Sequence, residues 1–225
     1  MDGSTYIVTG PGSASTSGAL IIPKYYNGKL VTGIDAAAFE YKNYTSVTIP
    51  DSINNIDGRA FDGCKQLKGV YISSISAWCN IDFFSDSPLY YAGNLYLNGN
   101  LVTELVIPHG ITSIKQSAFY GCSNLTKIVI PDGVTSIGDS AFSNCSKLTN
   151  ITLGENVTYI GNGAFSRCDS VIFKNPENWY VVVQADVVAS SGTPVSSKNL
   201  SDPAKAAELL TQSTYCSKNW NVRSK

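Results

Sequence analysis

Two adjacent stretches decide the fold: residues 122–142 read CSNLTKIVIPDGVTSIGDSAF, and residues 145–165 read CSKLTNITLGENVTYIGNGAF. Both follow one pattern, C-x-x-L-x-x-[IV]-x-[IL]-P-x-x-V-x-x-I-x-x-x-A-F, with Gly154 in the place of the proline. Self-similarity at a fixed period of this length is the signature of a solenoid, in which each repeat is one unit stacked on its neighbours. The sequence therefore predicts a repeat protein whose function lies on its surface.

The repeat also predicts the core. The Ala-Phe pair occurs five times, with the Phe residues 22, 58, 23 and 23 positions apart, and in four copies a cysteine follows three residues after the Phe. Lys42 takes the cysteine place in the first copy. Stacking places identical side chains above one another, so we expect ladders of buried residues. The predicted core ladder consists of Phe39, Phe61, Phe119, Phe142, Phe165, Cys64, Cys122, Cys145 and Cys168.

Each repeat contains one short strand with an inner and an outer face. In the stretch LTKIVI, alternation turns Ile128 and Ile130 inward and Lys127 and Val129 outward. Two outward columns follow: Ser46, Gly69, Glu104, Lys127 and Asn150, and beside them Thr48, Tyr71, Val106, Val129 and Thr152. Neither column has a dominant charge, so binding there would depend on shape and polar contacts. The predicted contact residues on this face are Tyr71, Glu104, Val106, Lys127, Val129, Asn150 and Thr152.

The motif I-P-x-x-[IV]-x-x-I-x-x-x-A-F-x-x-C resembles the BspA-like family of leucine-rich repeat proteins over about residues 20–170. The resemblance implies a leucine-rich-repeat solenoid of the right-handed β/α superhelix type, built mostly from short strands and turns. It also implies a bacterial protein that is secreted or held at the cell surface and acts by binding. We expect about five repeats of 22–23 residues, one insertion of about 35 residues and a C-terminal helical cap.

The repeat skips once, between Phe61 and Phe119, which indicates an insertion at about residues 73–102. This segment is rich in aromatic residues: Trp78, Phe83, Phe84, Tyr90, Tyr91 and Tyr96. Two interpretations remain open. The aromatic residues either form a small satellite core or present a recognition surface, for which Trp78, Tyr90 and Tyr91 are the candidates. Asn98-Gly99 predicts a type I′ hairpin turn.

Both ends depart from the repeat, as the ends of a solenoid must. Residues 1–20 predict an N-terminal cap with a strand at Tyr6–Val8, and residues 25–31 predict a hairpin. The solenoid is expected over 21–170 and a C-terminal cap over 171–225. Within the C-terminal cap we expect strands between 171 and 183, a loop over 189–199 and a helix over about 203–211 that begins at Asp202-Pro203. Tyr215 and Trp220 are expected to dock this tail onto the last repeat.

Composition excludes several classes of function. Charged residues make up only 15% of the chain and the net charge is −1, with no Lys/Arg cluster, so a nucleic-acid partner is not expected. No run of 18 apolar residues exists, so no membrane insertion is expected. The first residues lack the basic and apolar regions of a signal peptide, and we expect a secreted or cell-surface protein whose signal peptide has been removed.

The six cysteines and the single histidine do not form a recognisable site. Repeat phase favours buried thiols over disulfides or zinc ligands, although pairing between adjacent repeats and a Cys79–Cys216 bond both stay open. His109 occupies a turn position after the repeat proline and is expected in solvent. No nucleophile elbow, P-loop or zinc-protease motif occurs, so we expect neither catalysis nor a cofactor.

Three functions remain as hypotheses. The first is a monomeric, non-enzymatic adhesion module that binds a protein or glycan ligand on a host or neighbouring cell. The second is an architectural spacer or a self-assembling surface unit. The third is a glycan-binding module that uses the aromatic residues of the predicted insertion.

Overall fold

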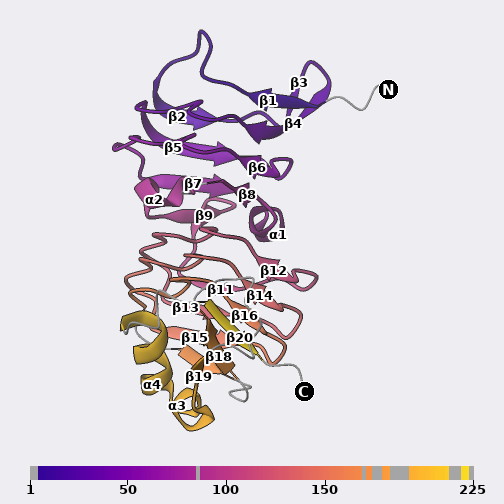
Figure 1. The fold of residues 1–225 in the computed structure, drawn as a ribbon. Helices are drawn as coiled ribbons and strands as arrows, with labels where there is room; N and C mark the ends of the chain where they lie inside the picture. The colour runs from indigo at the N-terminus through magenta and orange to yellow at the C-terminus, as the bar shows by residue number, and fades with distance from the viewer. Residues whose placement is uncertain are drawn as a thin grey trace. The chain divides into compact units, whose positions relative to one another are not determined.

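The structure, a computed structural model, describes residues 5–84, 87–168, 171–173, 179–182, 193–212 and 219–222. Cys216 and Tyr215 lie outside these residues. The chain divides into two compact units, Met1–Val102 (unit 1) and Thr103–Lys225 (unit 2). In each unit the chain winds as a solenoid between two sheets, as predicted (Figure 1). One complete turn of this winding is called a rung below.

Unit 1 contains two sheets whose order is β1-β4-β6-β8, with β3 beside β4, and β10-β9-β7-β5-β2. Among the described residues of unit 1, neighbouring rungs pair in parallel, and only the hairpin strands β3 and β10 pair antiparallel. The elements are β1 (Tyr6–Val8), β2 (Ser17–Ile21), β3 (Tyr25–Tyr26), β4 (Lys29–Ile34), β5 (Asn43–Ile49), β6 (Asn55–Ile56), β7 (Gly69–Ile72), α1 (Ile75–Cys79), β8 (Asp82–Phe83), α2 (Leu89–Ala92), β9 (Leu95–Leu97) and β10 (Asn100–Leu101). The expected hairpin at 25–31 is confirmed.

The predicted insertion at 73–102 is wrong for most of its length, because residues 73–97 form a rung of their own. Strand β8 pairs with β6, and β9 pairs with β7 through Val70 and Leu95, 25 residues apart. The regular rungs pair at 23 residues, as between Ile128 and Ile151. Helix α1 lengthens the path between the two sheets, and α2 stands between β8 and β9, where other rungs have the Ala-Phe turn. Only the β9–β10 hairpin, with its Asn98-Gly99 turn, departs from the winding.

The predicted N-terminal cap is also a rung. Strand β1 pairs in parallel with β4, and β2 pairs in parallel with β5, so residues 6–21 extend both sheets of unit 1. The strand predicted at Tyr6–Val8 is confirmed. The loop between β1 and β2 contains Gly10, Pro11 and Gly12 in place of the Ala-Phe turn, so it supplies no large apolar side chain to the core.

Unit 2 has a parallel sheet of order β11-β13-β15-β17 and a mixed sheet of order β12-β14-β16-β20-β18-β19. Its elements are β11 (Glu104–Val106), β12 (Ser113–Ile114), β13 (Lys127–Val129), β14 (Ser136–Ile137), β15 (Asn150–Leu153), β16 (Tyr159–Ile160), β17 (Val171–Phe173), β18 (Trp179–Val182), β19 (Thr193–Pro194), α3 (Ser197–Ser201), α4 (Pro203–Ala207), the π-helical turn η2 (Glu208–Gln212) and β20 (Asn219–Val222).

The tail of unit 2 covers its last rungs largely as predicted. Strand β20 pairs antiparallel with β16, and the side chain of Trp220 is fully buried. Asp202 caps α4 by accepting hydrogen bonds from the backbone N–H groups of Ala204 and Lys205. The loop predicted over 189–199 is wrong in part, because β19 lies within it and α3 begins within it; α3 ends at the residue before Asp202, where the chain restarts as α4.

The Ala-Phe turn is the same structure in every copy. The backbone N–H groups of Phe39, Phe119 and Phe142 donate to the carbonyls of Ala60, Ala141 and Ala164, so these three turns are bonded to the next rung. Residues two before and two after the Phe have a positive φ: Ala37, Arg59, Ser117, Ser140 and Gly163 before it, and Tyr41, Gly63, Gly121, Asn144 and Arg167 after it. This left-handed conformation costs a residue with a side chain about 1–2 kcal/mol.

The predicted core ladder is confirmed in both units. The five Phe rings are at most 4% exposed. Phe142 stacks on Phe119 at a centroid distance of 5.2 Å and on Phe165 at 5.5 Å, with interplanar angles of 2° and 3°. The motif cysteines are buried thiols, as predicted; the Sγ atoms of Cys145 and Cys168 donate to the carbonyl of the Phe one rung earlier, at 3.2 and 3.3 Å.

Candidate interaction surfaces

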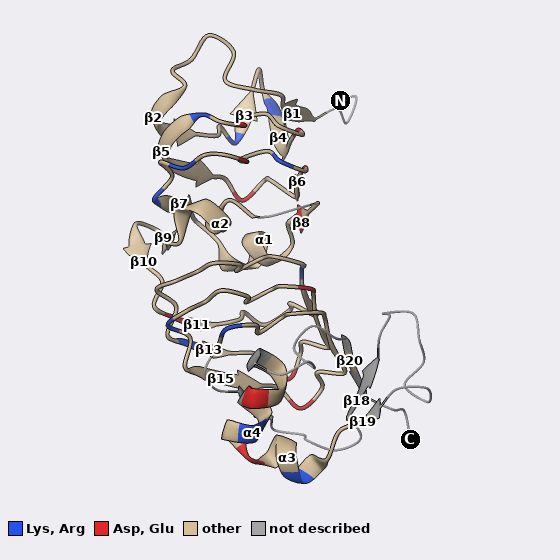
Figure 2. Cartoon of the chain, turned by 60° about the vertical axis from the view of Figure 1, so that its left-hand side comes forward, with Lys and Arg blue, Asp and Glu red and all other residues tan. Residues whose placement is uncertain are grey.

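The outward face of sheet β11-β13-β15, here the unit 2 strand face, has the predicted columns in register. Glu104 pairs with Lys127 and Lys127 with Asn150, while Val106, Val129 and Thr152 align in the same way beside them. The Lys127 ammonium lies 3.6 Å from the Glu104 carboxylate, and the cartoon is coloured for charged residues beside β11 and β13 in Figure 2. Val106 is 64% exposed. The result is a rigid face with two apolar positions, Val106 and the partly exposed Val129, one ion pair and neutral polar groups.

The corresponding face of unit 1 presents aromatic rings. Ser46 pairs with Gly69, and Thr48 pairs with Tyr71, as predicted. Tyr71 then pairs with Tyr96, and their rings stack at 4.5 Å with an interplanar angle of 6°. Tyr96 was not predicted for this column, because β9 lies in the segment that was expected to form an insertion. The apolar alternation of Leu95 and Leu97 was the available signal.

Gly69 makes room for the two rings. A Cβ atom at Gly69 would lie 3.0 Å from the ring of Tyr96 and 3.1 Å from the ring of Tyr71. Contacts this short would push both rings outward, so the absence of a side chain lets the pair lie close to the sheet.

A groove of about 540 Å³ lies beside Tyr71, at the ends of β5 and β7 and next to the β9–β10 turn. Polar groups surround it. The Lys24 ammonium lies 2.7 Å from the Asp51 carboxylate, and the hydrogen bond to Asp51 raises the pKa of Lys24. Asn98 and Gly99 line the groove from the hairpin turn, with φ of 50° and 81°.

The aromatic residues predicted for a recognition surface divide between core and surface. Trp78 is only 1% exposed and packs against Phe83 at 5.3 Å, so it is removed from the candidate surface and belongs to the interior. The hydroxyl of Tyr91 donates to the Asp62 carboxylate; burial, and next this bond, raise the pKa of Tyr91 to about 12. Tyr90 is 45% exposed and meets Tyr91 edge to face. The satellite-core interpretation therefore describes Trp78, while Tyr90 remains at the surface.

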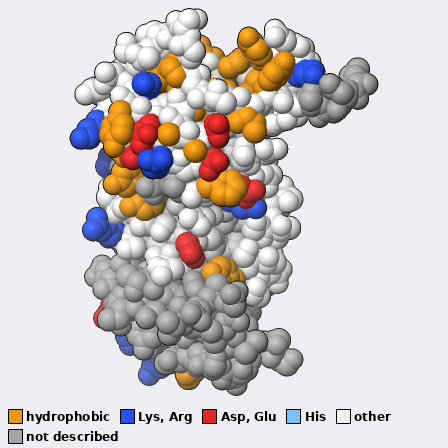
Figure 3. Space-filling view, turned by 45° about the horizontal axis from the view of Figure 1, so that its top comes forward, with side chains coloured by type: hydrophobic (Ala, Val, Ile, Leu, Met, Phe, Trp, Pro, Cys, Tyr) orange, Lys and Arg blue, Asp and Glu red, His pale blue; other side chains and the backbone are white. Residues whose placement is uncertain are grey.

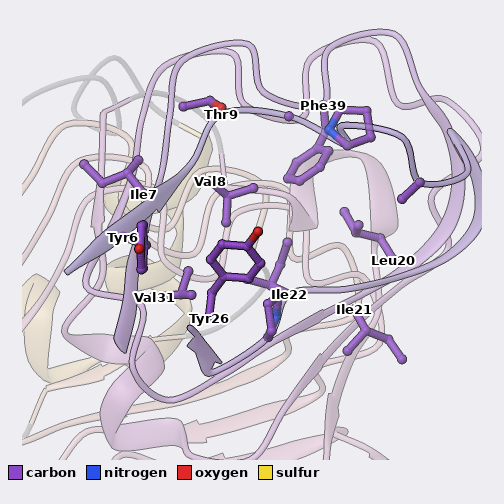
Figure 4. A pocket seen from close by; sticks show the side chains of 14 residues that line it. Tyr6, Ile7, Val8, Thr9, Leu20, Ile21, Ile22, Tyr26, Val31 and Phe39 are labelled. Atoms are coloured by element: carbon purple, nitrogen blue, oxygen red, sulfur yellow. The ribbon is translucent and has the colours of Figure 1, made fainter. Parts of the chain in front are cut away.

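Unit 1 also has an apolar pocket of about 530 Å³ at its N-terminal rung (Figure 4). Its lining includes Ile22, Val31 and Phe39, and none of its lining residues is charged. Hydrophobic side chains gather on this face in Figure 3, and Ile21, which also lines the pocket, is 71% exposed. The pocket exists because the β1–β2 loop brings no ring to cover Phe39. The expectation that residues 1–20 cover the end of the core is thus met only in part, and sequence analysis did not predict this pocket.

Nowhere in the described ranges do three or more His, Cys, Asp or Glu side chains gather in a way that could hold a metal ion. His109 is exposed in the turn after β11, as predicted. Cys79 is a buried thiol whose pKa is raised by burial to about 12. None of the helices in the described part of the chain has the length and apolar character needed to cross a membrane.

A family model for the BspA type leucine-rich repeat region, in six copies, matches residues 32–92 and 91–178. The chain belongs to the BspA type leucine-rich repeat family. The match includes residues 73–92, which agrees with the finding that the predicted insertion is a rung. Membership in this family indicates an interaction module built on a solenoid. No curated protein matches the chain.

Among solved structures, the BspA type chain is similar to several bacterial leucine-rich repeat proteins. A leucine-rich cell-surface protein of Faecalibacterium prausnitzii is 25% identical with a TM-score of 0.47, and the match covers 76% of this chain and 52% of the Faecalibacterium chain. A leucine-rich repeat protein of Eubacterium ventriosum is 21% identical with a TM-score of 0.43, covering 72% and 46%. The leucine-rich repeat protein of T. pallidum is 19% identical with a TM-score of 0.41, covering 68% and 77%. The chain thus spans about half the length of the first two.

Proposed function

We propose that this protein is a non-enzymatic module, secreted or held at the cell surface, that binds a protein on a host or neighbouring cell through the unit 2 strand face. The observation that carries the proposal is the register of β11, β13 and β15, which presents two columns of side chains on one rigid face. Solenoids use such repeated surfaces for binding. Membership in the BspA type family supports the same class of function.

The composition of the face indicates the kind of contact. Val106 offers an exposed apolar position, and the Lys127–Glu104 pair is open to solvent, with 45% and 65% of the two side chains exposed. Charges of both signs cancel, so long-range attraction contributes little to association. A partner is expected to dock slowly and to be held by short-range contacts along the columns.

A binding assay with matched variants tests this proposal. Immobilised extracellular-matrix proteins and intact epithelial cells serve as probes for the wild type, for Lys127→Glu with Val129→Arg, and for Lys147→Glu. Lys147 is an exposed lysine in the turn before β15, bonded to Asn124 at 2.7 Å, so Lys147→Glu controls for the Lys→Glu part of the double variant. We expect saturable binding that the double variant loses and the control keeps. Absence of binding to every probe, or equal binding by all three proteins, would contradict the proposal.

A further inference from the structure

The groove beside Tyr71 combines a flat ring with groups that both donate and accept hydrogen bonds. Tyr96 covers one face of the Tyr71 ring and holds it in place. Since Thr48, Tyr71 and Tyr96 succeed one another across adjacent rungs, the other face of the Tyr71 ring turns toward Thr48. Thr48 is small and exposed, and it lines the groove with Tyr71. An aromatic face is therefore available to a ligand at the wall of the groove.

The charges at the groove favour a neutral ligand rich in hydroxyl groups. Asp51 and Lys24 are paired at 2.7 Å, and 40% and 45% of their side chains are exposed. The pair has no net charge, so it would not attract a charged ligand. Burying an unpaired ion beside it would also be unfavourable. A hydroxyl group can accept a hydrogen bond from the ammonium and donate one to the carboxylate at the same time. Asn98, whose side-chain amide offers both donors and an acceptor, also lines the groove.

We propose that this groove binds one pyranose ring of a neutral carbohydrate. The apolar C–H face of the sugar would lie on the free face of Tyr71, and its hydroxyls would bond to Asp51, Lys24 and Asn98. Tyrosine suits this contact because its ring is a rigid apolar plane with a polar edge. The inference goes beyond the proposed protein contact and is independent of it, because all groove residues belong to unit 1 and that contact lies in unit 2.

The expected affinity is weak, because the groove is open and covers one sugar ring. A dissociation constant of about 0.1–10 mM is the appropriate range for a contact of this size. Saturation-transfer NMR detects binding in this range. The probes are the methyl β-glycosides of glucose, galactose, mannose and N-acetylglucosamine and their β-linked disaccharides, added to the complete chain. Transfer should be strongest at the ring protons of the face that lies on Tyr71.

Four variants separate the groove from the rest of the surface. Tyr71→Ala should weaken binding by at least about tenfold, and Asp51→Asn should weaken it by less, since other polar groups remain. Tyr71→Phe retains the ring and should bind like the wild type. Tyr90→Ala removes another exposed tyrosine of unit 1 and should also bind like the wild type. A cooperative thermal transition, with a midpoint well above the temperature of the binding measurement, confirms that each variant is folded.

Three results would overturn the proposal: no transfer to any glycoside at about 50 mM, equal binding by Tyr71→Ala and the wild type, or loss of binding on Tyr90→Ala alone. The last would instead place a sugar site at the α2 surface. Gly69→Ala provides a second check that removes no ligand group. Its Cβ would displace the rings of Tyr71 and Tyr96 and should reduce binding.

Discussion

Replacing Phe142 by Leu tests whether ring stacking, and not burial alone, stabilises the solenoid. Phe142 and Phe119 are both 0% exposed, so a change to Leu removes similar buried apolar area from each. They differ in their ring contacts. Phe142 stacks on Phe119 and on Phe165, whereas Phe119 has Phe142 as its one stacked ring among the described residues.

The difference in ring contacts gives the magnitude. A stacked aromatic pair contributes about 0.5–1.5 kcal/mol beyond the area it buries. Phe142→Leu loses two such pairs and should cost about 1–3 kcal/mol from stacking, while Phe119→Leu loses one and should cost about 0.5–1.5 kcal/mol. The loss from the smaller side chain is common to both and cancels in the comparison. The double variant loses the shared pair only once, so the coupling energy should also be about 0.5–1.5 kcal/mol.

Urea unfolding of the complete chain measures these values. Far-UV circular dichroism and tryptophan fluorescence must give the same transition, because a repeat array can lose two-state behaviour. The slope m should stay constant across the three variants, so that shifts of the midpoint report stability. Equal costs for Phe142→Leu and Phe119→Leu, or a coupling energy below about 0.3 kcal/mol, would refute the stacking argument.

Three further predictions concern the backbone and the buried ionisable groups. Ser140 has a φ of 55°, and Gly163 stands in its place in the next copy, so Ser140→Gly should raise stability by about 1 kcal/mol; an unchanged urea midpoint would count against this. Because burial raises the pKa of Cys79 to about 12, this thiol should resist iodoacetamide at about pH 8 until the chain unfolds, which peptide mapping can check. The pKa of Tyr91, raised to about 12 by burial and the bond to Asp62, favours the protonated phenol in the folded state. The contribution of Tyr91 to the free energy of unfolding should therefore be fully present below the unfolded pKa near 10 and be lost as the pH rises from about 10 to 12. Tyr91→Phe should make the loss of stability over this pH range smaller.

The parts of the fold that sequence predicted well depend on spacing alone. The pairing of Ile128 with Ile151 and the stack of Phe119, Phe142 and Phe165 follow from a period of 23 residues once the winding is known. The burial of the motif cysteines follows in the same way, since each stands at one fixed distance from its Phe. When consecutive copies have identical spacing, only one register of strand pairing places equivalent residues beside each other. The register of these strands could therefore be derived from the sequence.

The rung over residues 73–97 could not be recognised by that criterion. Helix α1 adds residues between β7 and β8, and the path from β8 to β9 is shorter than in the regular rungs, so every motif position shifts. Leu89 and Ala92 of α2 are buried between β8 and β9, in the part of the rung where the Ala-Phe pair is missing. The rung retains only the apolar side chains at its inward positions. Such a pattern is common in proteins, so it does not identify a repeat whose length has changed.

The groove beside Tyr71 was hidden for the same reason. It needs residues near 24, 48–51, 71–73 and 98–99, which come together only when β9 follows β7 in the sheet. The motif fixes the inward side chains and leaves the outward ones free to vary. Outward positions on the regular rungs of unit 2 are mainly polar or aliphatic, whereas β7 and β9 carry Tyr71 and Tyr96. Because these rings stack on each other on the outward face, apart from the Phe ladder, changing one should alter binding and cost about the 0.5–1.5 kcal/mol of a single stacked pair. The rung over residues 73–97, which departs from the repeat, therefore also supplies one ring of the aromatic face. A binding surface specific to this chain is to be sought on that rung.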